Sequence, residues 1–160
     1  MQPRLDAQKA SPGAYRAMLA LEMFIRKSSK LEPALLELVK MRASQINGCA
    51  YCIDMHSKDA RAEGESEQRL YALNAWRETP FFTDRERAAL AWTEAVTLVA
   101  GDHVPDALYE EARGQFSDEE LANLILAVVA INGWNRLSIA FRAVPGEYQP
   151  AGRKVEGAGQ

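Results

Sequence analysis

The feature that most constrains the fold of this sequence is the spacing of its apolar residues, which recur every three or four positions along nearly the whole chain. That spacing places side chains on one face of an α-helix, whereas a half-buried strand needs strict alternation of apolar and polar residues. No stretch shows that alternation convincingly. We therefore predict an all-α fold, a single-domain helical bundle of about six or seven helices.

Start and stop signals divide the chain into these helices. Residues 83–86 (TDRE) and 117–120 (SDEE) match the capping box, in which a hydroxyl and a carboxylate three residues later each accept a backbone N–H. Pro33 suits a first helical turn, and the Asn-Gly pair at 47–48 suits a helix end. The expected helices cover residues 11–28, 33–47, 49–63, 66–76, 83–100, 106–113 and 118–142.

The length of 160 residues allows one domain with a substantial buried core. We expect this domain to cover residues 1–145, with a Cys-x-x-Cys core at about 33–75. Residues 146–160 are rich in proline and glycine and are expected to form a flexible C-terminal tail.

Charge and hydropathy argue against two classes of partner. The net charge is −3, and basic residues alternate with acidic ones, so nucleic acid is not expected. The longest apolar run, residues 124–131, is far shorter than the ~20 residues of a membrane span. Because this run is apolar on all sides, its helix should lie in the core or in a subunit contact. The N-terminal residues lack a signal pattern, and we expect a cytoplasmic location.

The segment GCAYCIDMH, residues 48–56, contains both cysteines of the chain and one of its two histidines. In a helix that begins near Cys49, the side chains of Cys49, Cys52 and His56 lie along one face. First-turn N–H groups and a neighbouring imidazole both favour a thiolate, which lowers the pKa of Cys52. Cys49 is close enough to convert a sulfenic acid on Cys52 into a disulfide. The spacing thus predicts a redox-active thiol pair.

Other interpretations of these residues stay open. A Cys-x-x-Cys pair is also half of a zinc site, although only His56 and His103 remain as further ligands, and His103 is expected in a loop. The cysteines could equally be small buried apolar residues without chemistry. Trp134 and Asn135 need no ligand to explain them, because a buried tryptophan and a backbone-bonding asparagine are common structural residues.

The residues from Glu37 through MRASQINGCAYCIDMH resemble the alkyl hydroperoxidase D (AhpD) and carboxymuconolactone decarboxylase-like family. Its redox-active members have a glutamate, eleven intervening residues and then Cys-x-x-Cys-x-x-x-His, a spacing that Glu37, Cys49, Cys52 and His56 fit. NGWNR at residues 132–136 also resembles a recurring element of these relatives, and the likeness covers about residues 15–145. By its neighbours Glu32, Lys40 and Arg42 alone, Glu37 is more readily a solvated helix carboxylate, and only the family spacing gives it a functional role.

The resemblance implies an activity and a role for each of the four residues. Cys52 would be the peroxidatic nucleophile, His56 would take its proton, Glu37 would complete a proton relay and Cys49 would resolve the intermediate. A dithiol, such as the lipoyl group of a carrier protein, would reduce the resulting disulfide. The family fold is all-helical and forms trimers or larger rings, so a homo-oligomer (trimer or hexamer) is expected. No cofactor and no metal are implied.

One departure from the family pattern concerns Tyr51, which stands where the best-studied branch has a relay histidine. A phenol that titrates near ~10 is no base at neutral pH, so the relay is shorter here. We predict a thiol-dependent peroxidase acting on hydroperoxides. The alternatives are a decarboxylase-like lyase and a non-catalytic, redox-sensing or metal-holding helical oligomer.

Overall fold

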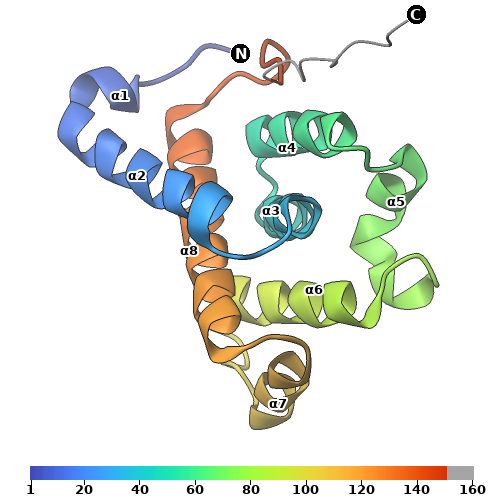
Figure 1. Cartoon of the computed structure of the whole chain (residues 1–160). Coiled ribbons are helices and arrows are strands. Elements are labelled where there is room, and N and C mark those ends of the chain that lie inside the picture. The colour runs from blue at the N-terminus through green and yellow to red at the C-terminus, as the bar shows by residue number, and fades with distance from the viewer. Residues whose placement is uncertain (151–160) are drawn as a thin grey trace, which may run out of the picture.

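The computed structural model describes residues 1–150, and every regular element in this range is helical (Figure 1). The predicted all-α fold is therefore confirmed. The elements are α1 (Ala7–Ala10), α2 (Pro12–Ser28), α3 (Pro33–Asn47), α4 (Ala50–Ala62), α5 (Glu67–Ala72), the 3-10 helix η1 (Leu73–Glu78), α6 (Asp84–Thr97), α7 (Asp106–Gln115) and α8 (Asp118–Phe141).

Two differences from the expected helices have local causes. The short α1 begins where the Asp6 carboxylate accepts the backbone N–H of Lys9, and four residues are too few to show helical periodicity. The single helix expected at residues 66–76 is divided into α5 and η1, with a kink at Ala75, whose φ of −120° is not helical. Neither a proline nor a glycine marks that kink in the sequence.

The predicted helix ends are correct where the sequence signal is strong. Both capping boxes form, Thr83 with Glu86 at the start of α6 and Ser117 with Glu120 at the start of α8. Gly48 ends α3 in the left-handed region at φ +67°, which glycine adopts without steric cost. Cys49 follows directly as the N-cap of α4.

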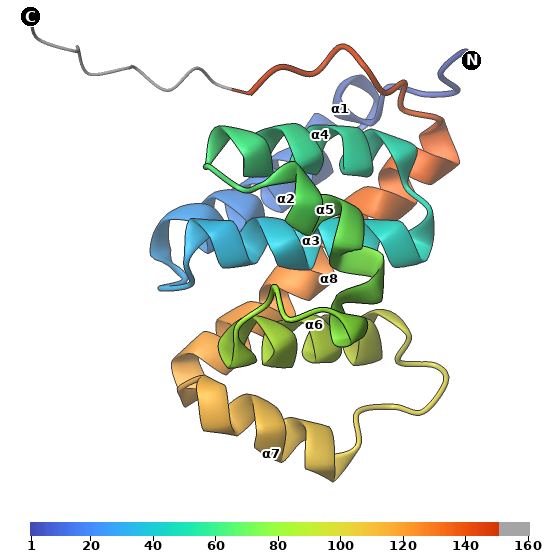
Figure 2. The same ribbon diagram turned by 90° about the vertical axis from the view of Figure 1, so that its right-hand side faces the viewer.

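Helix α3 lies at the centre of the molecule, between α4 on one side and α6 on the other, and α8 runs past all three (Figure 1). A view from the side shows α4, α3, α6 and α7 stacked in that order (Figure 2). The main core joins side chains of α2, α3, α6, α7 and α8, among them Ile25, Val39, Trp92, Leu124 and Val128. A smaller cluster around Cys49 and Cys52 includes Ala43 and Ile131.

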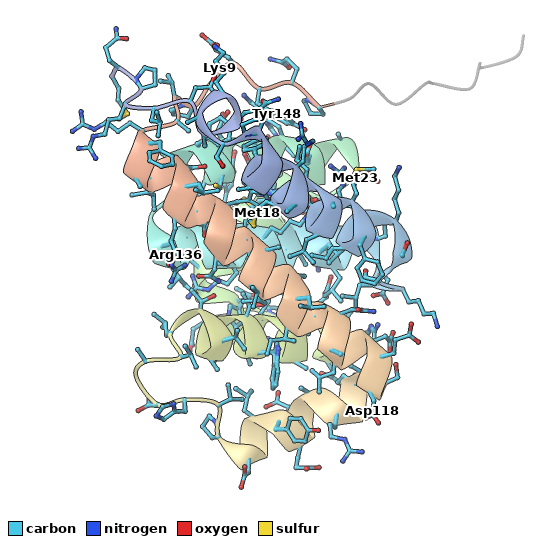
Figure 3. The ribbon with its side chains drawn as sticks, turned by 90° about the vertical axis from the view of Figure 1, so that its left-hand side faces the viewer. Lys9, Met18, Met23, Asp118, Arg136 and Tyr148 are labelled. Carbon is cyan, nitrogen blue, oxygen red and sulfur yellow. The ribbon has the colours of Figure 1, made fainter. Side chains whose placement is uncertain are left out.

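Helix α2 crosses α8 closely at Met18 (Figure 3). A side-chain carbon added at Gly133 would lie 2.9 Å from Met18 Cε, so the bare glycine backbone gives the Met18 side chain its space. Gly133 of the NGWNR segment thereby lets α2 pack closely against the face of α8 that carries Trp134.

Helix α8 is long and apolar enough to cross a membrane by length and composition alone, and in the structure one side of it packs within the bundle. It packs against α2, α3, α4, α6 and α7, and one third of its most apolar stretch is buried within the fold. The other side of the helix is open, and its exposed apolar side chains include Ile125, Leu126 and Val129.

The N-terminal segment is bonded to the end of α8, and the C-terminal segment is bonded to α4. The Arg4 N–H donates to the Phe141 carbonyl oxygen at the end of α8. The Gly146 N–H donates to Asp54, and Lys58 Nζ donates to the carbonyl oxygens of Gly146 and Tyr148. Residues 151–160, the rest of the expected tail, lie outside the described residues.

Candidate active site

The two cysteines lie at the start of α4 with their sulfur atoms 2.7 Å apart, and both are free thiols. Cys49 and Cys52 are each only 1% exposed. The left-handed turn at Gly48 reverses the chain between α3 and α4, which places Cys49 at the N-cap and Cys52 in the first turn. The Cys52 N–H donates to Cys49 Sγ, and the Cys52 thiol also lies 3.8 Å from Ser138 Oγ on α8.

This contact makes the two thiols titrate as one unit. The hydrogen bond from Cys52 lowers the pKa of Cys49 to about 7, against the opposing effect of burial. The pKa of Cys52 is raised, because its thiol donates that hydrogen bond and is itself buried. The sulfur–sulfur contact lets the pair share one negative charge, and the thiolate on Cys52 stays a prediction from the sequence.

His56 lies one helical turn after Cys52 on α4 and forms a buried pair with Glu37 of α3. The distance from His56 Nδ1 to Glu37 Oε2 is 2.8 Å, and both residues are buried. Burial alone would raise the pKa of Glu37, but the His56 hydrogen bond and the charges of His56, Lys40 and Arg26 lower it overall. With Glu37 ionised, Nδ1 of His56 must carry a proton, which leaves Nε2 able to accept one.

Lys40 provides the countercharge for this pair from within α3. It is 1% exposed, and its Nζ lies 2.5 Å from Glu22 Oε1 and 3.7 Å from Glu37 Oε1. A buried charge needs such partners because its desolvation is costly. Sequence reasoning treats Lys40 only as a polar neighbour of Glu37, since nothing in the sequence marks its burial.

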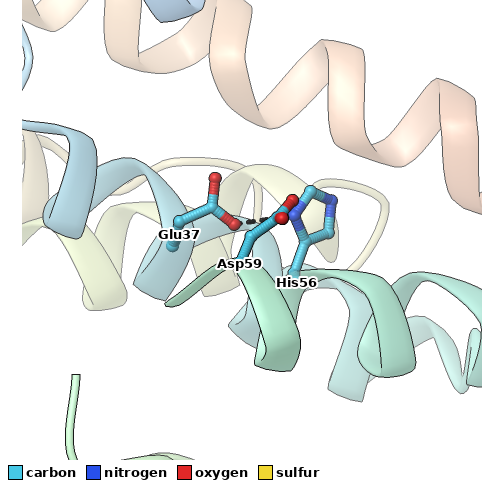
Figure 4. Close-up of side chains that lie close together, drawn as sticks. All are labelled: Glu37, His56 and Asp59. Atoms are coloured by element: carbon cyan, nitrogen blue, oxygen red, sulfur yellow. Dashed lines mark hydrogen bonds and ion pairs between the residues drawn. The ribbon is translucent and has the colours of Figure 1, made fainter. Parts of the chain in front are cut away.

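Asp59 joins the cluster from α4, three residues after His56 and on the same helix face (Figure 4). The potential ligand atoms of Glu37, His56 and Asp59 lie within 4.8 Å of one another, which is metal-like spacing. However, each of these side chains already has a partner: Glu37 and His56 bind each other, and Asp59 accepts a hydrogen bond of 2.7 Å from the Tyr148 hydroxyl.

Asp59 and Tyr148 are missed by sequence reasoning. The i, i+3 spacing to His56 is the signal that could have suggested Asp59. Tyr148 has no such signal, because it reaches the site from the C-terminal segment through tertiary packing.

A cavity of about 410 Å³ connects the cysteine pair with the His56 side chain. Cys52 and His56 both line it, whereas Cys49 does not. Its other walls come mainly from α2, α4, α8 and the N-terminal segment, and they include the aromatic and apolar side chains Tyr15, Leu19, Tyr51, Met55, Trp134, Leu137 and Phe141. Tyr15 and Trp134 meet edge to face with ring centroids 5.3 Å apart. The site can hold an apolar molecule against Cys52.

Tyr51 and His103, which the sequence analysis also considered, are less central to the site. Burial raises the pKa of Tyr51, so its phenol stays neutral and can only wall the cavity or donate a hydrogen bond. His103 lies exposed between α6 and α7, as expected of a loop histidine.

Comparison with known proteins places the chain in a family. Residues 12–95 match the carboxymuconolactone decarboxylase family. The uncharacterized protein YdfG of Bacillus subtilis is 43% identical over 140 residues, which cover 88% of this chain and 95% of YdfG. The crystal structure of ATU0492 from Agrobacterium tumefaciens, a protein of unknown function provisionally assigned to the AhpD antioxidant defence proteins, has a TM-score of 0.87 and 45% identity and covers 92% of this chain and 100% of its own.

A more distant structure shares the fold alone. It is the AhpD-core, uncharacterized peroxidase-related protein of Ralstonia eutropha, with a TM-score of 0.77 and 20% identity over 88% of this chain and 74% of its own. Together, the matched residues and the extent of these similarities show that the chain belongs to the carboxymuconolactone decarboxylase family and has the AhpD-like helical fold.

Proposed function

We propose that this protein is a thiol-dependent peroxidase that reduces hydroperoxides with the Cys49–Cys52 pair. The observation that carries the proposal is that Cys52 and His56 line one cavity while Cys49 contacts Cys52 from behind it. A nucleophile, an acid–base group and a resolving thiol are thus within reach of one bound molecule.

The first step of this reaction breaks the O–O bond. The pair holds one proton and one negative charge, and Nε2 of His56 accepts that proton from Cys52, the sulfur that lines the cavity. The Cys52 thiolate attacks the terminal oxygen of the hydroperoxide and becomes a sulfenic acid. The departing alkoxide takes this proton back from Nε2 of His56 and leaves as an alcohol.

The second step joins the two cysteines in a disulfide. The Cys49 sulfur attacks the Cys52 sulfur, the S–S bond forms and the sulfenic oxygen leaves as water. Overall, the singly charged pair, one hydroperoxide and one proton give a disulfide, an alcohol and water. An external dithiol then reduces the disulfide by exchange and is itself oxidised. We propose a lipoyl-type dithiol as donor and the reducing cytoplasm as location.

Hydroperoxide consumption in the presence of excess dithiol tests the proposal. Cys52→Ser should abolish turnover. Cys49→Ser should allow a single turnover and leave a sulfenic acid that a 1,3-diketone reagent traps. Consumption that persists in the double serine variant would contradict thiol chemistry and favour a lyase of the decarboxylase type. Stoichiometric zinc bound through the thiols in the purified protein would favour a metal-holding role instead.

A further inference from the structure

A second, smaller cavity lies on the other side of the Glu37–His56 pair. Its volume is about 110 Å³, which gives room for several water molecules. It lies between α2, α3, α4 and the C-terminal segment, and Glu37, Ala62 and Glu63 line it without lining the larger cavity. Glu63 and Ala62 are exposed residues at the end of α4, so this cavity is close to bulk solvent.

The two cavities share a wall made of Arg26, Asp59 and Tyr148, each of which lines both. His56 lines only the larger cavity and Glu37 only the smaller one, yet their side chains are hydrogen bonded at 2.8 Å. The Glu37–His56 bond therefore passes from one cavity to the other.

The shared wall is fixed in place by several hydrogen bonds. Tyr148 donates to Asp59 at 2.7 Å, and Lys58 binds the Tyr148 carbonyl oxygen at 3.0 Å. The Gly146 N–H donates to Asp54 at 3.0 Å, which holds the segment that leads to Tyr148. The wall thus separates the two spaces through residues that come from three parts of the chain.

The two spaces differ in character. The larger one is walled mainly by aromatic and aliphatic side chains, and a bound hydroperoxide would fill the space beside Cys52. The smaller one presents three carboxylates, a guanidinium and a phenol. Water and protons are therefore better accommodated in the smaller cavity.

We propose that the smaller cavity is the route by which the Glu37–His56 pair exchanges protons with solvent, so that a proton reaches the site without crossing the substrate cavity. The inference rests on the proposed function, in which His56 supplies a proton and oxidation of the singly charged thiol pair consumes one. Nε2 of His56 accepts the Cys52 proton while Nδ1 passes its own proton to Glu37 and the small cavity. The reverse shift returns a proton through Glu37 to Nδ1 as Nε2 protonates the departing alkoxide.

The charges around the route suit proton uptake. Glu22 and Arg26 on α2, Lys40 on α3 and Asp59 on α4 all face the pair, and Glu63 lines the mouth of the small cavity. The acidic groups outnumber Lys40 and Arg26, so the local potential attracts a proton rather than repels it. The Tyr148 phenol remains protonated, since burial and Asp59 raise its pKa to about 12.

Plugging the small cavity tests the proposal without touching a site residue. Ala62→Met and the larger Ala62→Phe place a side chain at its mouth, whereas Ala62→Ser leaves it open. Ala107→Met is a matched control at an exposed alanine on α7, away from the site. The readout is the rate at which the His56 Nδ1 proton exchanges with water, measured by NMR. Only two histidines have to be distinguished, and a His103 variant identifies the His56 signal.

We expect exchange of this proton to slow several-fold in Ala62→Met or Ala62→Phe and to stay at the wild-type rate in both controls. A general loosening of the fold would speed exchange, so slowing is specific to a blocked route. Tyr148→Ala, which joins the two cavities, should speed it. Unchanged exchange in both plugged variants would overturn the proposal.

A second measurement separates this inference from the peroxidase proposal. In single-turnover oxidation by a hydroperoxide, followed by tryptophan fluorescence, the plugged variants should react roughly tenfold more slowly, within the 10²–10⁴-fold that a positioned acid–base group supplies. If proton exchange is slowed in the plugged variants but no hydroperoxide oxidises the wild-type protein, the route stands and the peroxidase activity is refuted. Normal oxidation and normal exchange in the plugged variants would refute the route and leave the activity standing.

Discussion

At the scale of single residues, the sulfur pair is the part of the site whose chemistry depends most on geometry. The spacing of Glu37, Cys49, Cys52 and His56 predicts that they gather, and the structure brings Glu37 to His56 and Cys49 to Cys52. Which sulfur carries the charge could not be predicted, because it depends on the direction of one hydrogen bond and on the burial of both sulfurs. Asp59 and Tyr148 escaped prediction for a related reason, since their contact depends on where the C-terminal segment packs.

The pH dependence of thiol reactivity follows from the lowered pKa of Cys49. A thiol with a pKa of about 7 instead of 9.0 is ionised at a lower pH, so the alkylation rate of the reduced pair should rise with pH through a midpoint near 7. Cys52→Ala removes the hydrogen bond that stabilises the thiolate, and the midpoint of Cys49 should move to higher pH. Ser138→Ala should move it in the same direction by less, because the Ser138 hydroxyl contributes less to the lowered pKa. Alkylation followed by mass spectrometry gives both midpoints, and a wild-type midpoint near 9 would contradict this account.

At the scale of helices, sequence signals located the starts of α3, α4, α6 and α8 and the end of α3, because each has a local cause in a cap, a proline or a left-handed glycine. The kink between α5 and η1 had no such signal. The ion pair that holds α2 against α3 could not be predicted either, because the packing of the whole bundle determines that Lys40 is buried.

The Lys40–Glu22 ion pair that joins α3 to α2 gives a prediction about stability. Lys40→Met leaves Glu22 and Glu37 without their buried countercharge, and removing one partner of a buried pair costs about 3–5 kcal/mol. The double variant Lys40→Met with Glu22→Gln should lose less than the single variant, because one of the uncompensated charges is then gone. Urea unfolding measures the free energy of unfolding for each protein.

A surface ion pair of the same type provides the control for this prediction. Lys30 binds Glu119 with side chains that are 66% and 58% exposed, so Lys30→Met should cost no more than about 1 kcal/mol. Equal losses for Lys40→Met and Lys30→Met would show that the buried network does not hold α2 in place.

At the scale of the whole molecule, the all-helical class follows from apolar spacing that persists along nearly all of the chain. The arrangement of the helices does not follow from it, because the same amphipathic pattern permits many packings. The sequence does indicate that the helix at residues 118–142 has apolar side chains on all sides between residues 124 and 131. In the structure one side of this helix, α8, is in the core and another carries exposed apolar side chains that no residue in the range 1–150 covers.

We propose that a second copy of the chain covers this surface in a homo-oligomer, a trimer or hexamer. Ile125, Leu126 and Val129 lie within two turns of α8 and form one exposed apolar stripe, and Val129 is 52% exposed. Val129→Asp puts a charge in the contact and should yield monomers with unchanged helical content, because the side chain packs against little of its own subunit. Tyr71→Asp, at an exposed aromatic residue on α5, should leave the assembly intact. Sedimentation velocity measures the mass, and a wild-type protein that sediments as a monomer would contradict the proposal.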